Sequence, residues 1–207
     1  MKQLAVLLPA LCFGLFSFAA KADTLQLVSA SAQTGGEYIY PYNFSINNST
    51  TLTGLMCMDL DRTTTFGEKW NVTQTAIPTS GPNAVKYQEE AYIFSQLGKG
   101  PYSDSQVQWA GWGIFSPGDH ENAAYDAGAQ QLVADAVAAV TSGPGLSSVF
   151  LSHYVLYIPT GDQTNWTNGI PQEFIGTAQT PEPSSLVLLG SGLLGVAGAV
   201  RRKLARA

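Results

Sequence analysis

Cysteine and histidine are scarce in this chain, which has two of each in 207 residues. Cys12 lies inside an apolar N-terminal run, so Cys57 is the one cysteine in the body of the sequence. A lone cysteine cannot form an intrachain disulfide, although small extracellular domains usually pair their cysteines. Cys57 is therefore a free thiol, half of an intermolecular disulfide, or a reactive group held by other chemistry.

Positive charge is also scarce in residues 23–180. They contain fourteen of the fifteen acidic residues but four of the ten lysines and arginines, a formal net charge of −10. Nucleic acid binding requires a basic surface, so we expect no nucleic acid partner. No second histidine stands at ligand spacing from His120, and Asp59, Asp61 and Glu68 lack the spacing of an EF-hand loop. We expect no metal centre and no cofactor.

Recognisable catalytic patterns are missing as well. The sequence contains no nucleophile elbow and no convincing pair of carboxylates for acid–base hydrolysis. We therefore do not expect an enzyme, which leaves targeting, binding and attachment as the function classes that the sequence can support.

Long apolar runs occur at the two ends of the chain. Residues 1–22 combine a charged start at Lys2, an apolar run and an Ala-Lys-Ala sequence before Asp23, which predicts a cleaved secretory signal peptide. Residues 184–200 carry no charge, and these 17 residues are just enough to span a bilayer as a helix. Basic residues after this run would hold the tail on the cytoplasmic side. We expect an exported domain tethered through residues 184–200.

Short motifs flank the C-terminal apolar run. Pro181, Glu182 and Pro183 precede it, and Arg201 and Arg202 follow it. This three-part order closely resembles the PEP-CTERM sorting signal. The resemblance implies export across the inner membrane of a Gram-negative bacterium and processing by an exosortase-type enzyme. It also implies a destination at the cell surface or in an exopolysaccharide matrix.

Between the ends, residues 23–178 suffice for one exported domain with its own core. Alternating patterns predict strands within 24–75 and again within 148–178, and helical periodicity predicts an insert over 84–140. Residues 179–207 form the sorting segment. We expect an α+β fold, a β-sandwich or barrel with a three-helix insertion.

Several local predictions can be checked against a structure. Strands over 38–46 and 52–60 form a hairpin, and Pro41 inside the first indicates an edge or a bulge. A later strand covers 148–158. We expect three helices with these bounds and caps: residues 84–97 after Asn83, residues 106–115 after Ser103 or Asp104, and residues 122–140.

The segment 106–115 is the most unusual part of the domain, because it combines two tryptophans and two glycines with no charge. This composition predicts a buried helix. The small residues Ala110 and Gly111 would let the helix approach its neighbour closely, with Gln108 carried inward.

A second resemblance joins this helix to Cys57. The matching residues are Cys57-Met58-Asp59 late in a strand, Ala91-Tyr92 in a helix, and Gln108-Trp109-Ala110-Gly111-Trp112 in the next helix. Their order resembles the thioester domains of Gram-positive surface adhesins over about residues 37–116. In that family the matching cysteine and glutamine form an internal thioester, which the resemblance carries over to Cys57 and Gln108. Gly111 departs from the pattern, where the family usually has a larger aliphatic residue.

The residues also support this chemistry independently. A thiol held against a carboxamide in a dry site can displace ammonia, because positioning supplies a large effective concentration. Trp109 and Trp112 would shield the product from water, with Ala110 and Asp59 in support. The product would be a single-use electrophile for an amine-bearing surface or matrix.

The alternative is that Cys57 is a small buried apolar residue. The protein would then be a non-reactive structural or carbohydrate-binding matrix component, in which exposed aromatic side chains contact an exopolysaccharide.

Overall fold

The computed structural model describes residues 22–161, 169–178, 190–193 and 195. Residues 1–21 of the predicted signal peptide and most of the predicted span 184–200 lie outside this part. Among the residues that are described, no helix is long and apolar enough to cross a membrane.

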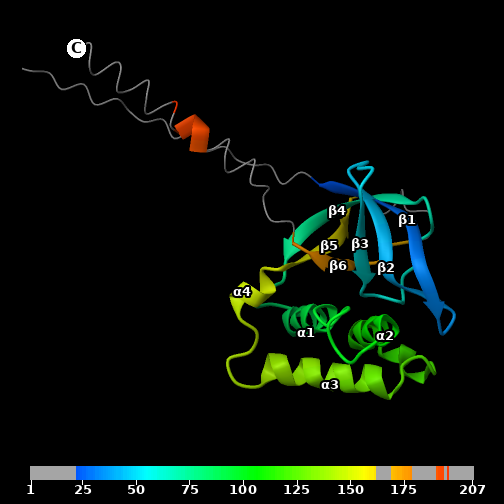
Figure 1. Ribbon diagram of the computed structural model, residues 1–207. Coiled ribbons are helices and arrows are strands. Elements are labelled where there is room, and N and C mark those ends of the chain that lie inside the picture. The colour runs from blue at the N-terminus through cyan, green and yellow to red at the C-terminus, as the bar shows by residue number, and fades with distance from the viewer. Residues whose placement is uncertain (1–21, 162–168, 179–189, 194, 196–207) are drawn as a thin grey trace, which may run out of the picture.

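Six antiparallel strands form a closed barrel (Figure 1), which decides between the barrel and the sandwich of the prediction. The order around the barrel is β1-β2-β3-β6-β5-β4. Pairing of β6 with both β3 and β5 closes it. The strands are β1 (Asp23–Thr34), β2 (Glu37–Ile46), β3 (Leu52–Cys57), β4 (Lys69–Ala76), β5 (Tyr154–Thr160) and β6 (Phe174–Thr177).

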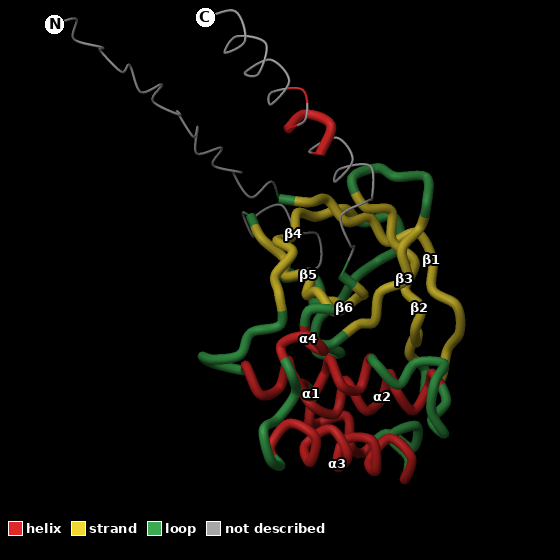
Figure 2. Tube along the Cα trace, turned by 60° about the vertical axis from the view of Figure 1, so that its left-hand side comes forward, coloured by secondary structure: helices red, strands yellow, loops and turns green. Residues whose placement is uncertain are grey.

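The predicted helical insertion lies between β4 and β5. Its elements are α1 (Ala84–Phe94), α2 (Asp104–Phe115), the 3-10 helix η1 (Pro117–Glu121), α3 (Ala127–Thr141) and the short α4 (Ser148–Leu151). The three long helices gather on one side of the barrel, with α1 and α2 between the barrel and α3 (Figures 1 and 2). Both faces of the α1–α2 layer are therefore covered, which explains why α2 has no charged residue after its first turn.

Aromatic side chains fill the barrel. Phe44 packs edge-on against Phe174 and Trp70, with ring centroids 4.7 Å and 5.7 Å away. Tyr42 meets Phe174 in the same manner at 5.6 Å. This cluster is continuous with the apolar side chains of the helices, so barrel and insertion share one core. The interior of this small barrel is thus filled by side chains.

The hairpin prediction is confirmed, since β2 and β3 pair antiparallel. The register between β1 and β2 shifts at Pro41, where Tyr40 and Pro41 together stand opposite the single residue Ser31. This is a β-bulge, which bends a strand locally. The edge alternative is wrong because β2 pairs on both sides, and β3 ends at Cys57, before the predicted limit of residue 60.

The predicted strand over 148–158 is wrong in its first half. Ser147 accepts a hydrogen bond from the backbone N–H of Phe150 at 3.1 Å and starts the short helix α4. His153 follows in a turn, and the strand begins only at Tyr154. The local cap overrides the alternating pattern there.

One predicted helix cap and one predicted helix start are also corrected. Asn83 precedes α1 but has a left-handed backbone (φ 61°) and its side chain makes no capping bond. The third helix begins at residue 127 and not at 122, because Asp126 caps it through the N–H groups of Gly128 and Ala129. Asn122 instead organises a turn by accepting a hydrogen bond from Ala124 N–H at 2.9 Å.

Candidate functional site

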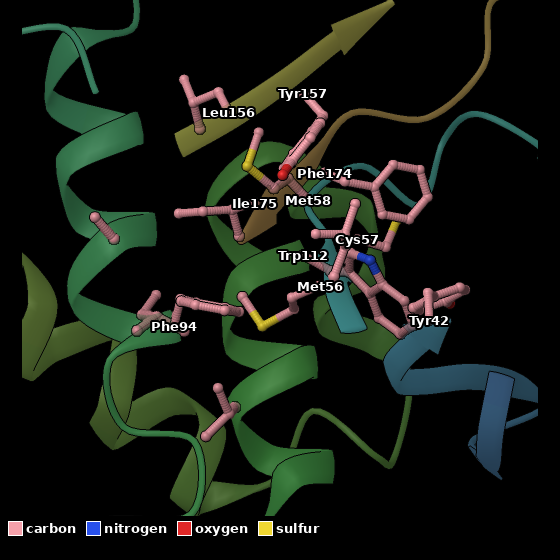
Figure 3. Packing of buried hydrophobic residues seen from close by; sticks show 14 of the residues in the cluster. Tyr42, Met56, Cys57, Met58, Phe94, Trp112, Leu156, Tyr157, Phe174 and Ile175 are labelled. Carbon is pink, nitrogen blue, oxygen red and sulfur yellow. The ribbon is translucent and has the colours of Figure 1, made fainter. Parts of the chain in front are cut away.

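Cys57 is the last residue of β3 and has no exposed surface. Its Sγ donates a hydrogen bond to the backbone oxygen of Asp59 at 3.4 Å. Burial raises the pKa of the thiol to about 12, so it carries its proton at neutral pH. Trp112 lies beside it (Figure 3) and opposes this rise in pKa, although the indole N–H has no partner of regular hydrogen-bond geometry. Cys57 is therefore a protected neutral thiol.

Gln108 lies in the second turn of α2. Of the two predicted caps, Ser103 is the cap and forms a capping box with Gln106, and the helix begins at Asp104, earlier than the predicted residue 106. The Gln106 side chain also binds the carboxylate of Asp126, the cap of α3, and so fixes the two helix starts together. This arrangement holds the next turn of α2 against the barrel.

The structure brings the two predicted thioester residues into contact. Nε2 of Gln108 donates a hydrogen bond to the backbone oxygen of Cys57 at 2.6 Å, and Gln108 is fully buried. Its Oε1 has no hydrogen-bond partner. Leaving a buried amide oxygen unsatisfied costs about 1–3 kcal/mol. The carboxamide is therefore held at Cys57 with its acyl oxygen free.

The residues predicted to shield this contact are buried as well. Trp109 and Trp112 are both fully buried and pack edge-to-face with ring centroids 4.9 Å apart. The β1–β2 hairpin closes over Trp109 at Gly35, where a β-carbon would lie only 2.7 Å from the indole Cζ2. Gly35 also has a positive φ of 66°, so a larger residue there would be strained twice over. Ala110 is buried in the same helix.

Asp59 supports the site through a charge network. Its carboxylate pairs with Nε of Arg62 at 2.8 Å, and Arg62 also binds Glu173 at 3.1 Å. Tyr87 of α1 donates its hydroxyl to the same Glu173 at 2.9 Å. Burial raises the pKa of Asp59, while Arg62 opposes that shift. The network links the segment after β3 to the residue before β6 and to α1.

The structure adds a residue that the sequence argument missed. Glu90 of α1 is fully buried, and neither carboxyl oxygen has a hydrogen-bond partner. Burial, and then the charge of Glu89, raise the pKa of Glu90 well above its ordinary value. Helical spacing puts Glu90 beside the apolar stripe of Tyr87, Ala91 and Phe94, but a glutamate in such a place is normally at the solvent edge of the stripe, so its full burial is a finding of the structure.

The two histidines of the chain contact other groups. His120 stacks on Tyr125 with ring centroids 4.4 Å apart, and its Nε2 lies 3.1 Å from the oxygen of Gly113. His153 is exposed in the turn before β5. No three His, Cys, Asp or Glu side chains in the described part of the chain gather as a metal site would require.

The C-terminal segment settles the targeting question. Residues 179–203 match the PEP-CTERM protein-sorting motif. The chain carries a PEP-CTERM sorting signal. This confirms the assignment made from Pro181, Glu182, Pro183, Arg201 and Arg202, which lie outside the described residues.

The PEP-CTERM signal implies export in a Gram-negative bacterium, with membrane-associated processing by an exosortase. No curated protein and no solved structure matches the chain. The similarity of residues 37–116 to adhesin thioester domains stays a prediction.

Proposed function

We propose that this PEP-CTERM protein is a surface or matrix protein that attaches covalently to amine-bearing partners through an internal Cys57–Gln108 thioester. The observation that carries the proposal is the buried hydrogen bond from the Gln108 carboxamide to the backbone oxygen of Cys57, which holds the carboxamide at this residue and leaves its own oxygen without a hydrogen-bond partner. A hydrophobic residue would fill this place without an unsatisfied polar atom. A reactive role would explain why a glutamine with an unsatisfied oxygen occupies this buried position.

The proposed chemistry has two steps. In the first, Sγ of Cys57 attacks Cδ of Gln108, the S–C bond forms, the C–N bond breaks, and the nitrogen leaves as ammonia. In the second, an incoming amine attacks the same carbon, an amide forms, and the thiol of Cys57 is restored. The acyl group is used once, which makes the protein an adhesive and not an enzyme.

Burial supports storage of such a bond. Both partner residues and both tryptophans have no exposed surface, so bulk water does not reach the acyl carbon in the closed domain. An amine can enter only when the domain opens locally. The resting protein would therefore be long-lived and its reaction with amines slow.

The intact mass of the exported protein tests the proposal. Displacement of ammonia lowers the mass by about 17 Da, and methylamine then adds about 31 Da to the thioester form. Cys57→Ala and Gln108→Glu should both show their full calculated masses, because one lacks the nucleophile and the other lacks an amide leaving group. A full wild-type mass with a thiol that is alkylated after unfolding would refute the thioester.

A second candidate function rests on a different observation. Tyr38 and Phe66 pack edge-to-face at 5.1 Å and remain 38% and 50% exposed, an arrangement suited to stacking on sugar rings. In a non-reactive matrix protein, Tyr38→Ala with Phe66→Ala would abolish retention on exopolysaccharide. Methylamine would leave that retention unchanged, whereas it would block covalent attachment through a thioester.

A further inference from the structure

The carboxyl group of Glu90 occupies a position that no structural bond explains. It lies between α1 and α2, directly over Gly111, where a β-carbon would be 2.6 Å from Oε1 and 3.2 Å from Oε2. The side chain is fully buried and both oxygens are unpartnered. Gly111 is the residue at which this chain departs from the adhesin pattern, and the absence of a side chain there makes room for the carboxyl.

The contact with Gly111 places the Glu90 carboxyl on the side of α2 that carries Gln108. Gly111 follows Gln108 by three positions, so the two share one face of α2. The charge of Glu90 acts on the thiol of Cys57 from α1. The carboxyl, the carboxamide and the thiol therefore lie on the same side of α2 and come from three different elements, and Glu90 forms no hydrogen bond to either partner.

The titratable groups around Glu90 leave it as the available proton carrier. On α1, Glu89 is its acidic neighbour, and α2 presents no titratable side chain after Asp104. On the side of β3, the carboxylate of Asp59 is already paired with Arg62. Glu90 has no such partner.

The condensation requires a proton carrier. The resting thiol is neutral, so its proton must be removed as sulfur attacks carbon. An amide nitrogen is a poor leaving group unless it receives a proton. A single carboxyl group can serve both needs, because one oxygen accepts a proton while the other donates one.

We infer that Glu90 is the proton-transfer residue of the Cys57–Gln108 condensation, an inference that rests on the proposed function. The unprotonated oxygen takes the thiol proton while the hydroxyl gives its proton to the departing nitrogen. Ammonia leaves, the thioester remains, and the carboxyl again holds one proton. Capture of an amine runs the same exchange in reverse, with the amine proton passed to the sulfur of Cys57.

The test follows bond formation in the full chain made by cell-free translation. Synthesis is stopped, the pH is set between 5 and 9, and the loss of ammonia is followed by intact mass. Glu90→Gln should slow the loss by about 100-fold or more, the typical contribution of general acid–base catalysis. The matched control Glu89→Gln, the adjacent acidic residue, should keep the wild-type rate at the plateau of its pH profile.

The pH profile gives a readout that a purely structural role would not change. The wild-type rate should fall at high pH as Glu90 loses the proton that it donates, and Glu90→Gln should lack this fall. If Glu90→Gln does not fold, Glu90→Ala with added formate replaces it, because formate can enter the vacated space and restore the rate. A wild-type rate and profile in the variants, or no rescue by formate, would overturn the role of Glu90 alone. A wild-type chain that never loses ammonia would overturn the thioester and this role together.

Discussion

The close approach of Gly111 to Glu90 can be measured as a coupling free energy. Replacing Gly111 with alanine has two opposing effects. Alanine favours a helix interior by about 1 kcal/mol over glycine. The new β-carbon, however, would sit 2.6 Å from Oε1 of Glu90 in a fully buried site, and overpacking of this kind costs roughly 1–3 kcal/mol. We expect Gly111→Ala to be neutral or to destabilise the domain by up to about 2 kcal/mol.

Removal of the glutamate should reverse the sign. In a Glu90→Ala background the clash is absent, so Gly111→Ala should stabilise the domain by about 1 kcal/mol. The two substitutions are then coupled by about 1–3 kcal/mol. Urea unfolding of residues 23–178, followed by tryptophan fluorescence, measures each free energy of unfolding. All variants carry Cys57→Ala, so that no thioester contributes.

Gly113 provides the matched control. It lies on the same helix, but a β-carbon there would meet the ring of Tyr125 at 2.7 Å and not Glu90. The effect of Gly113→Ala should therefore be the same with and without Glu90. Additivity of Gly111→Ala and Glu90→Ala within about 0.5 kcal/mol would refute the placement of the carboxyl over Gly111.

Three further predictions concern stability. The pKa of Glu90 is higher in the folded state than in the unfolded state. Its effect on the free energy of unfolding is therefore fully favourable below about pH 4.3, and this free energy falls by about 1.4 kcal/mol per pH unit as pH rises toward the folded-state pKa. In urea unfolding at pH 4–8, the free energy of unfolding of Glu90→Gln should rise relative to that of wild type as pH increases. Parallel plots of the two free energies against pH would contradict this. Phe44→Ala should destabilise the domain by about 3–5 kcal/mol in thermal or urea unfolding, because its ring is fully buried in the aromatic cluster of the barrel. A loss below about 1 kcal/mol would show that the barrel repacks. Arg62→Met leaves Asp59 and Glu173 without their shared cation, so the variant should lose more stability at pH 7 than at pH 4; equal losses would show that the network carries no charge-dependent stability.

Much of the fold follows from local patterns in the sequence. Alternation predicts the strands up to residue 75, and helical periodicity predicts the three long helices. The closure of the barrel does not follow, because it depends on Cys57 pairing with Phe174, more than a hundred positions later. The start of α4 was missed for the opposite reason: a single local cap at Ser147 outweighs a strand-like pattern.

The candidate site likewise contains residues that the sequence predicts and one that it does not. Cys57 and Gln108 can be predicted, since an unpaired cysteine and an uncharged tryptophan-rich helix are visible as residues. Glu90 could not be assigned a role from sequence, because a glutamate is normally placed in solvent. Its burial becomes evident only when α1, α2 and β3 are packed together.

The position of β6 has a mechanical consequence for the predicted C-terminal tether. Any pull on the C-terminal segment enters the domain through this four-residue strand. Its neighbour on one side is β3, where Met56 and Cys57 pair with Ile175 and Phe174. If the protein is held at the cell envelope through this segment, as its sorting signal predicts, the load would pass along the strand that pairs with Cys57. Tension that strips β6 from β3 would break the barrel where two residue pairs join these strands and would uncover Cys57 from the backbone side. In the proposed thioester form, the same event would expose the acyl group.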